Sequence, residues 1–227
     1  TLSPILLAGH ISAAPIVDIE DIRRSGEVGN FKDLSFALSG SRGNENRDDI
    51  DLSLSFVNNN LISEKLFVYE KSERTKDESV EDESSFMHAR ILWKNTDKPF
   101  DFETYFQNSE NPFQRYKKRE IYGFGLRFSD LKRLKLGLSL LNENEKSLSD
   151  ITKKTDRINI YLFKKVNFEN NTSVSLTTFI QPSINEISDD YKYSFSASYR
   201  INISEQFSIK FKLSESYDSD PPDLADE

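Results

Sequence analysis

Alternation of apolar and polar residues at every second position is the feature that most constrains the fold of this chain. The clearest case runs from Leu134 to Leu140, where Lys135, Gly137 and Ser139 separate the leucines. Successive side chains of a β-strand point to opposite faces, so this spacing predicts a strand with one apolar and one polar face. Similar segments recur from about residue 32 to the end of the chain. They predict about eleven strands of roughly nine to eleven residues, the length that crosses a bilayer at a tilt.

The connections between these strands are predicted to alternate between long and short. The long, charged ones are Ser41–Asp49, Lys71–Ser84, Asn108–Lys118, Asn142–Asp156, Gln181–Asp190 and a last one from Asp218. The short ones are Asn58–Ile62, Asn95–Pro99, Ser129–Lys132, Asn167–Asn171 and Asn202–Glu205. Transmembrane β-barrels of the bacterial outer membrane have long loops on one side and short turns on the other. This rhythm therefore favours such a barrel over a soluble sandwich.

The composition agrees with a barrel. The chain is 36% hydrophobic and has no apolar run of eighteen residues, which argues against a transmembrane helix, whereas a barrel strand needs only one apolar residue in two. Aromatic residues collect toward the strand ends and predict two interfacial girdles. These residues are Phe56, Trp93, Phe100, Phe128, Phe168 and Phe207 at the short turns, and Phe106, Tyr191, Tyr193 and Tyr217 at the long loops. We predict an all-β, antiparallel, up-and-down transmembrane β-barrel, and a soluble β-barrel or sandwich is the alternative.

An even strand number is the rule for single-chain bacterial barrels, so eleven strands leave one unaccounted for. We expect about twelve strands, with the last, closing strand missing from this chain. Residues 1–14 end in small residues and are interpreted as the remainder of a secretory signal, with a buried N-terminal strand or helix as the alternative. Residues 15–31 then form a periplasmic lead-in, and residues 32–227 form the barrel domain.

Several kinds of chemistry are excluded or disfavoured by counts. The chain has no cysteine, so it has neither disulfides nor thiolate metal sites. Its net charge of −8 argues against a nucleic-acid partner. Only two histidines are present, and His10 lies in the predicted signal, so a metal site built from several histidines is excluded. We predict no cofactor, no metal and no catalytic residues.

Two further features are candidate sites. His88 has serines nearby, but its parity places it on the polar face, away from lipid, so a Ser–His lipid-modifying enzyme is the least favoured alternative. The acidic stretch Asp77–Glu83, and the aspartates Asp218, Asp220 and Asp223, could bind divalent cations that bridge to lipopolysaccharide. Acidic runs are usually solvated loops, and we expect that for Asp77–Glu83. For the three aspartates, which surround Pro221 and Pro222, we expect a rigid turn at the barrel rim.

The polar face of the later strands is rich in bases. The predicted basic wall is Arg127, Lys135, Arg157, Lys165, Lys192, Arg200, Lys210 and Lys212, and the predicted opposing acids are Asp33, Asp51, Asp101 and Glu103. A segregated wall of this kind would favour the passage of small anions. The alternative is that the two walls pair across a lumen filled by side chains, through which nothing passes.

Specific segments resemble the bacterial family of salt-induced outer membrane proteins, whose function is unknown. The resemblance rests on Ile16–Glu20, Leu34–Asn44, Phe86–Trp93, Asn111–Arg127 and Ile209–Pro222, in that order and spacing. It implies an outer-membrane β-barrel with a link to salt or osmotic stress, and it implies no catalytic residues. The expected function is therefore a narrow, porin-like pore or a structural barrel of the bacterial outer membrane, surrounded by its lipids. The competing hypothesis is an adhesion or ligand-binding barrel that acts through acidic external loops.

Overall fold

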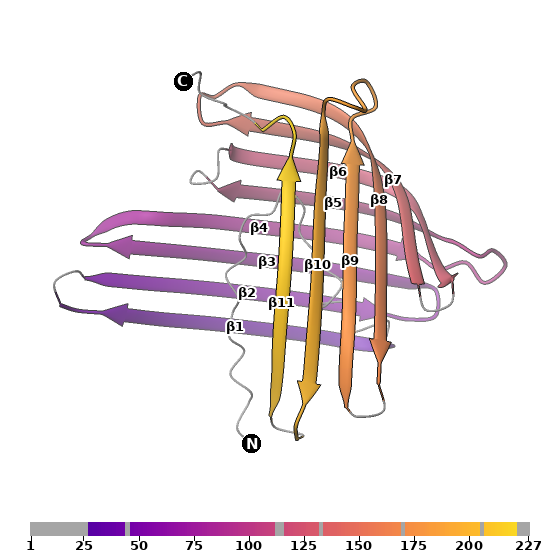
Figure 1. Cartoon of the computed structure of the whole chain (residues 1–227), viewed down its shortest axis with the longest axis horizontal. Helices are drawn as coiled ribbons and strands as arrows, with labels where there is room; N and C mark the ends of the chain where they lie inside the picture. Colours follow the sequence, from indigo (N-terminus) through magenta and orange to yellow (C-terminus); the bar gives the residue numbers. More distant parts are fainter. Residues whose placement is uncertain are drawn as a thin grey trace.

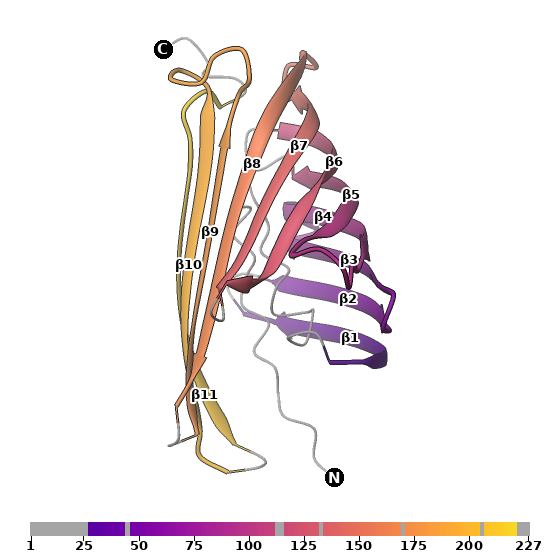
Figure 2. The ribbon, with the colours of Figure 1, turned by 90° about the vertical axis from the view of Figure 1, so that its right-hand side faces the viewer.

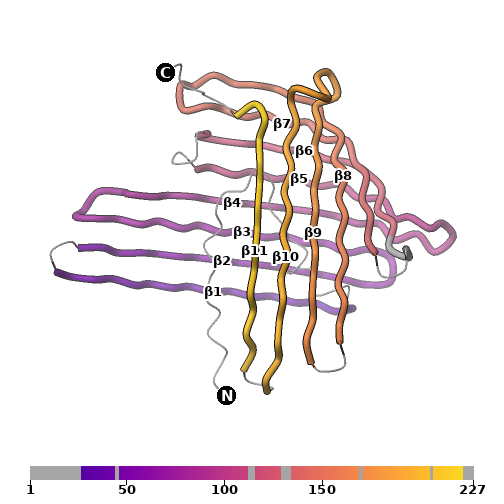
Figure 3. Tube along the Cα trace, in the orientation of Figure 1, coloured from indigo at the N-terminus to yellow at the C-terminus, as the bar shows by residue number. Residues whose placement is uncertain are grey.

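The computed structural model describes residues 27–43, 46–111, 116–131, 134–168, 171–204 and 207–221, with the backbone alone for residues 129–131. They form one sheet of eleven antiparallel strands in which each strand pairs with its neighbours in sequence (Figures 1 and 3). The strands are β1 (Gly29–Ser41), β2 (Arg47–Asn59), β3 (Ser63–Lys76), β4 (Ser79–Trp93), β5 (Asp101–Asn111), β6 (Tyr116–Leu131), β7 (Leu134–Ser147), β8 (Thr152–Asn167), β9 (Thr172–Pro182), β10 (Tyr191–Asn202) and β11 (Ser208–Asp218). The predicted strand number, order and antiparallel direction are confirmed.

The sheet is strongly curled. β9, β10 and β11 run crosswise in front of β1–β4, and the perpendicular view shows these two groups as facing walls (Figures 1 and 2). Within the described residues no pairing joins β1 to β11, so the sheet is open and does not show the closed barrel that was predicted. No helix that could cross a membrane is found in the described part of the chain.

The two faces of the sheet differ as the alternation predicts. We call the face inside the curl the inner face and the opposite one the outer face. On the outer face Phe124 is 61% exposed and Leu140 57%, whereas on the inner face Arg127 and Arg157 are each 1% exposed. The apolar side chains thus point away from the enclosed space, and charged side chains point into it.

The inner face is not polar throughout. Val57, Leu66, Val68 and Phe86 form a buried cluster on β2, β3 and β4, which explains why the alternation is weakest in β3. On the next strands glycine makes room for an aromatic ring. A Cβ on Gly123 would lie 2.0 Å from Cζ of Tyr105, so the Tyr105 ring crosses β6 directly over this glycine.

The lengths of the connections differ from the predicted alternation of long loops and short turns. We call the end where odd-numbered strands finish the distal end and the other the proximal end. Only Asp77 and Glu78 separate β3 from β4, where a long loop was expected, whereas Lys94–Phe100 separate β4 from β5, where a short turn was expected. The predicted strand lengths are also too short, because the strands span 11 to 16 residues.

Cross-strand ion pairs explain this error. Lys71 lies 3.3 Å from Glu83, and Arg74 lies 2.7 Å from Asp49, so dense charge extends the hairpin arms as paired strand. In the sequence, the same charged residues indicate a long loop at Lys71–Ser84. The predicted signal and most of the lead-in lie outside the described residues, and β1 already includes the end of the predicted lead-in.

Candidate functional site: an ion cluster on the inner face

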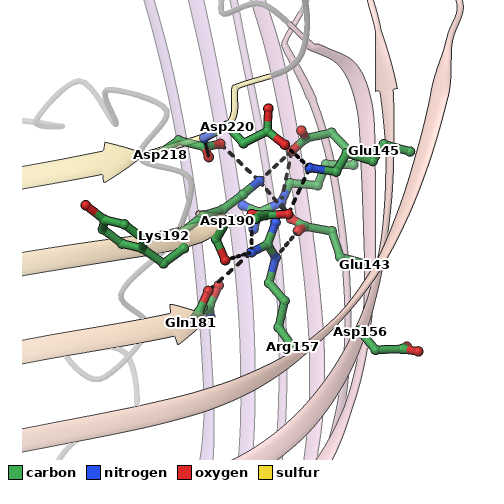
Figure 4. Close-up of polar contacts among 12 residues, drawn as sticks. Glu143, Glu145, Asp156, Arg157, Gln181, Asp190, Lys192, Asp218 and Asp220 are labelled. Carbon is green, nitrogen blue, oxygen red and sulfur yellow. Dashed lines mark hydrogen bonds and ion pairs between the residues drawn. The ribbon is translucent and has the colours of Figure 1, made fainter. Parts of the chain in front are cut away.

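A cluster of nine charged side chains lies on the inner face near the distal end. The strand register places residues of opposite charge next to each other in this cluster. Arg119 on β6 pairs with Glu145 on β7, and Lys192 on β10 pairs with Asp218 on β11. We call it the distal ion cluster, and its members are Arg119, Glu143, Glu145, Lys153, Arg157, Asp190, Lys192, Asp218 and Asp220. All of them except Arg119 and Lys153 are labelled in Figure 4.

Glu143 is the acceptor at its centre. Nε of Arg157 donates to Oε2 of Glu143 at 2.6 Å, and Nε of Arg119 donates to Oε1. Nζ of Lys192 lies 3.2 Å from the same Oε1 atom. One carboxylate that is 2% exposed therefore contacts three cations from three strands. A buried charge needs this kind of compensation, since an unpaired one would cost several kcal/mol.

Lys192 and Asp190 extend the network toward the last strand. Nζ of Lys192 also lies 3.0 Å from Glu145 and 3.1 Å from Asp218. Asp190, in the connection before β10, lies 2.7 Å from Arg157 and 2.8 Å from Lys153. Burial by itself would raise the pKa of Asp190, but the contacts with Lys153 and Arg157 outweigh it, and the pKa is lowered.

The arrangement links several strands through ion pairs. Its four cations and five carboxylates form ion pairs that connect β6, β7, β8, β10 and β11, with one negative charge in excess. No hydroxyl or thiol nucleophile belongs to it. What it can do is fix the relative position of strands that lie far apart in the chain, and fill the distal part of the enclosed space.

The comparison with protein families decides what the chain is related to. A family model described as a protein of unknown function, DUF481, matches residues 34–227, which includes every strand after the start of β1. The chain belongs to the DUF481 family. No curated protein matches it, and no solved structure does.

The predicted basic wall falls into two parts in this DUF481 sheet. Arg157 and Lys192 are in the distal ion cluster, and Arg127 is buried with its guanidinium 5.3 Å from the Tyr161 ring. Lys135 is half-buried over the Phe163 ring, at 5.3 Å. The remaining four are exposed toward the proximal end, namely Lys165, Arg200, Lys210 and Lys212.

The predicted opposing acids contact residues of neighbouring elements. Glu103 lies 3.5 Å from Arg90, Asp33 accepts a hydrogen bond from Ser55, and Asp101 accepts one from the backbone of Asn95. Asp51 is half-buried on β2. These contacts join Glu103 to β4, Asp33 to β2 and Asp101 to the connection between β4 and β5.

Three of the five acids of the cluster are absent from the predicted site residues. Glu143, Glu145 and Asp190 were assigned to connections, although Glu143 and Glu145 continue the parity of Ser139 and Leu141 on β7. Extending the period of two beyond the last apolar residue would have found the first two. Nothing in the alternation marks Asp190, because it lies outside the strands.

The other predicted residues are placed as follows. His88 is 3% exposed on the inner face, stacked between the rings of Phe86 and Tyr105.

At the proximal end the Phe100 ring contacts Phe102 and Phe128, while Trp93, Phe168 and Phe207 are exposed. At the distal end the Tyr217 ring stacks with Tyr193 and contacts the tilted ring of Tyr191. Phe106 is the last apolar residue on the outer face of β5, paired with Tyr122, and Phe56 lies near the proximal end of β2.

The acidic stretch is part of the β3–β4 hairpin. Within it Glu81 lies 3.2 Å from Arg47 and Glu83 lies 3.3 Å from Lys71. In the described ranges no group of three or more acidic or histidine side chains is arranged to hold a metal ion. Asp218 and Asp220 contact lysines of the distal ion cluster, and Asp223 lies outside the described residues.

Proposed function

We propose that this DUF481 protein is an outer-membrane β-barrel of the bacterial envelope, non-enzymatic, whose sheet forms the wall of the barrel. The observation that carries the proposal is the inverted distribution of side chains. Phe36 is 66% exposed and Leu213 67%, whereas Lys192 and Arg157 are 1% exposed. A water-soluble sheet buries its apolar face, and only a hydrocarbon solvent makes the opposite arrangement favourable.

The outer face has the banded pattern that a bilayer requires. On β7 four leucines occupy alternate positions from Leu134 to Leu140, and Asn142, Asn144 and Lys146 follow at the same parity. On β6 the series Phe128, Leu126, Phe124 and Tyr122 is followed by Glu120 and Lys118. An apolar band about 25 Å tall, bounded by polar residues, is the membrane-facing signature of such barrels.

The crosswise strands support a barrel as well. Strands tilted by about 35–45° to a barrel axis cross at roughly twice that angle on opposite walls. In this sheet β9–β11 run crosswise in front of β1–β4 (Figure 1). β1 and β11 run in the same direction, so one further antiparallel strand between them would satisfy both open edges. We propose a closed barrel of twelve strands on this ground, because open edges are not tolerated in hydrocarbon.

Two matched cysteine variants test the membrane assignment, since the protein has no cysteine of its own. Ala197 lies between Leu176 and Leu213 on the outer face, and Ser196 lies between Thr177 and Ser214 on the inner face. A nitroxide attached in Ala197→Cys should be relaxed by oxygen, which concentrates in hydrocarbon. A nitroxide attached in Ser196→Cys should be relaxed less by oxygen, because this position faces the polar interior. Equal, water-like accessibility at both positions would rule out a membrane-facing outer face.

The charged interior favours a structural barrel or a narrow pore. The distal ion cluster fills the distal part, while exposed bases line the proximal part. Single-channel recording in planar bilayers separates the two roles. A pore should conduct with anion preference, and Lys210→Gln with Lys212→Gln should reduce that preference. A folded barrel without current would leave the structural role. The link to salt or osmotic stress rests on the family resemblance, and impaired growth of a deletion strain at high salt would support it.

A binding or adhesion role is the second candidate, because the β3–β4 hairpin carries charged residues well beyond the apolar band. The Lys71–Glu83 ion pair joins its two arms, and Arg74 links its β3 arm to Asp49 on β2, so the hairpin is held as a stiff ribbon. Replacing Lys71–Ser84 with a tight turn should abolish adhesion if the ribbon is the binding element. The same variant should leave the conductance unchanged.

A further inference from the structure

A hollow of about 570 Å³ lies in the outer face over β2–β7. Small residues, Ala89 and Thr104, form its floor, and the rings of Phe67, Phe106 and Phe124 are among those that form its walls. Register explains this shape, because Ala89 lies between Phe67 and Phe106 in one cross-strand row and Thr104 adjoins Phe124 in the next. We call this hollow the outer groove. Its volume lies within the range of about 300–1,000 Å³ typical of small-molecule sites.

The outer groove presents an apolar surface even at its polar lining residue Thr104. The hydroxyl of Thr104 donates to the backbone oxygen of Gly123 at 3.0 Å, so it is satisfied within the sheet. Two cations line the groove, of which Arg90 is half-buried and Lys65 is exposed, and Lys65 lies toward the proximal end. A hydrocarbon ligand with an anionic group at its proximal end matches this arrangement.

A second cation stands close to the same end. Lys32 on β1 is exposed, and its Nζ lies 6.0 Å from the centre of the Phe56 ring, which lines the groove. Lys32 and Lys65 flank β2, and strands two apart are separated by about 10 Å. Two lysine side chains of full length can reach one phosphate over that span. Both lie where the apolar band ends, since Leu34 and Phe67 follow them on the outer face.

We propose that the outer groove binds one anionic glycerophospholipid of the proximal leaflet, with an acyl chain over Ala89 and Thr104 and the phosphate between Lys32 and Lys65. This site rests on the proposed membrane location. A lipid fits better than a second copy of the chain, because a two-fold contact through the groove would bring the lysines of both copies together. Like charges at such a contact are unfavourable.

The fluorescence of Trp93 can report whether a lipid occupies the outer groove. It is the only tryptophan, and it lies on the outer face at the proximal end of β4. Trp93 pairs with Ser63 while Lys65 pairs with Ile91, so Trp93 and Lys65 are diagonal neighbours at about 7–8 Å. The full chain is refolded into phosphatidylcholine vesicles that contain a small fraction of phosphatidylglycerol brominated near the head of its acyl chains. Brominated phosphatidylcholine at the same fraction is the reference for neutral lipid.

The expected result is stronger quenching of Trp93 by the brominated phosphatidylglycerol. Each lysine should raise the relative association about fivefold. Lys32→Gln with Lys65→Gln should remove the excess. Lys164→Gln is the matched control, because Lys164 is an exposed outer-face lysine at the proximal end of β8, away from the groove. This variant should keep the excess.

Ala89→Phe separates a groove from simple attraction to lysines, because it fills the floor and leaves both charges in place. The proposal expects the excess quenching to disappear in this variant as well. Equal quenching by the two brominated lipids in the unmodified protein, or a full excess in Ala89→Phe, would overturn the lipid site while leaving the membrane location intact. Loss of the excess as the protein-to-lipid ratio rises would show a second copy in the groove and also overturn it. If neither lipid quenches Trp93, the proposed membrane location itself fails.

Discussion

Oε2 of Glu143 accepts a hydrogen bond from Nε of Arg157 at 2.6 Å, and both side chains are almost fully withdrawn from solvent. Because Glu143 also contacts Arg119 and Lys192, Glu143→Gln would leave three buried cations short of a partner. We expect it to lower the free energy of unfolding by about 3–5 kcal/mol. Urea titration of the protein refolded into vesicles measures this loss.

The matched control for that prediction is Glu120→Gln on the outer side of β6. Glu120 pairs with Lys118 at 2.8 Å, but both side chains are partly exposed. Its loss should cost no more than about 1 kcal/mol. Similar losses for the two variants would mean that the distal ion cluster does not stabilise the fold.

Asp190 gives the cluster a predictable dependence on pH. Because its pKa is lowered in the folded protein, its stabilising contribution is present above the ordinary pKa of an aspartate. That contribution is lost as the pH falls below this value, through the lowered pKa of the folded state. Asp190→Asn should therefore reduce stability by about 3 kcal/mol at pH 7. The difference from the unmodified protein should shrink below about pH 4. A difference that stays constant from pH 7 to pH 3 would contradict the assignment.

Gly123 is predicted to resist substitution because the Tyr105 ring covers it. The hydroxyl of Tyr105 lies 3.0 Å from Oγ of Ser139, and the added methyl of Gly123→Ala would displace the ring. We expect a loss of about 2 kcal/mol. Adding Tyr105→Ala should make the combined loss smaller than the sum of the two single losses. Gly43→Ala, with no atom within 4 Å of the new Cβ, is the control and should be nearly neutral.

We expect that one substitution in the β3–β4 turn will increase the stability of the hairpin. Asp77 and Glu78 both have positive φ, at 46° and 67°, which is the backbone of a two-residue hairpin turn that favours glycine at its second position. Glu78→Gly should stabilise the hairpin by up to about 1 kcal/mol by relieving the left-handed strain. Ser79→Gly, one residue later in β4, should be destabilising instead. Unchanged or lower stability in Glu78→Gly would argue for a mobile loop in place of the turn.

Most of the sheet follows from the sequence, and the misses share one cause. The period of two located all eleven strands and assigned Leu138 and Ser139 to opposite faces, because alternation is a local property of the strand backbone. It failed where charges replaced apolar residues at the strand ends, as at Lys71–Lys76 and around Glu143. There a strand exists only because its neighbour supplies a partner.

The division between sequence and tertiary structure is clearest at the distal ion cluster. The alternation alone determined that Arg157 and Lys192 lie on the polar face of their strands. Only the curl and register of the sheet decided that Lys192 meets Glu143, a residue 49 positions away. Such a partner depends on how strands stack across the whole sheet, and no local pattern encodes that distance. The sequence determines which way each side chain points, and the packing of distant strands determines what it meets there.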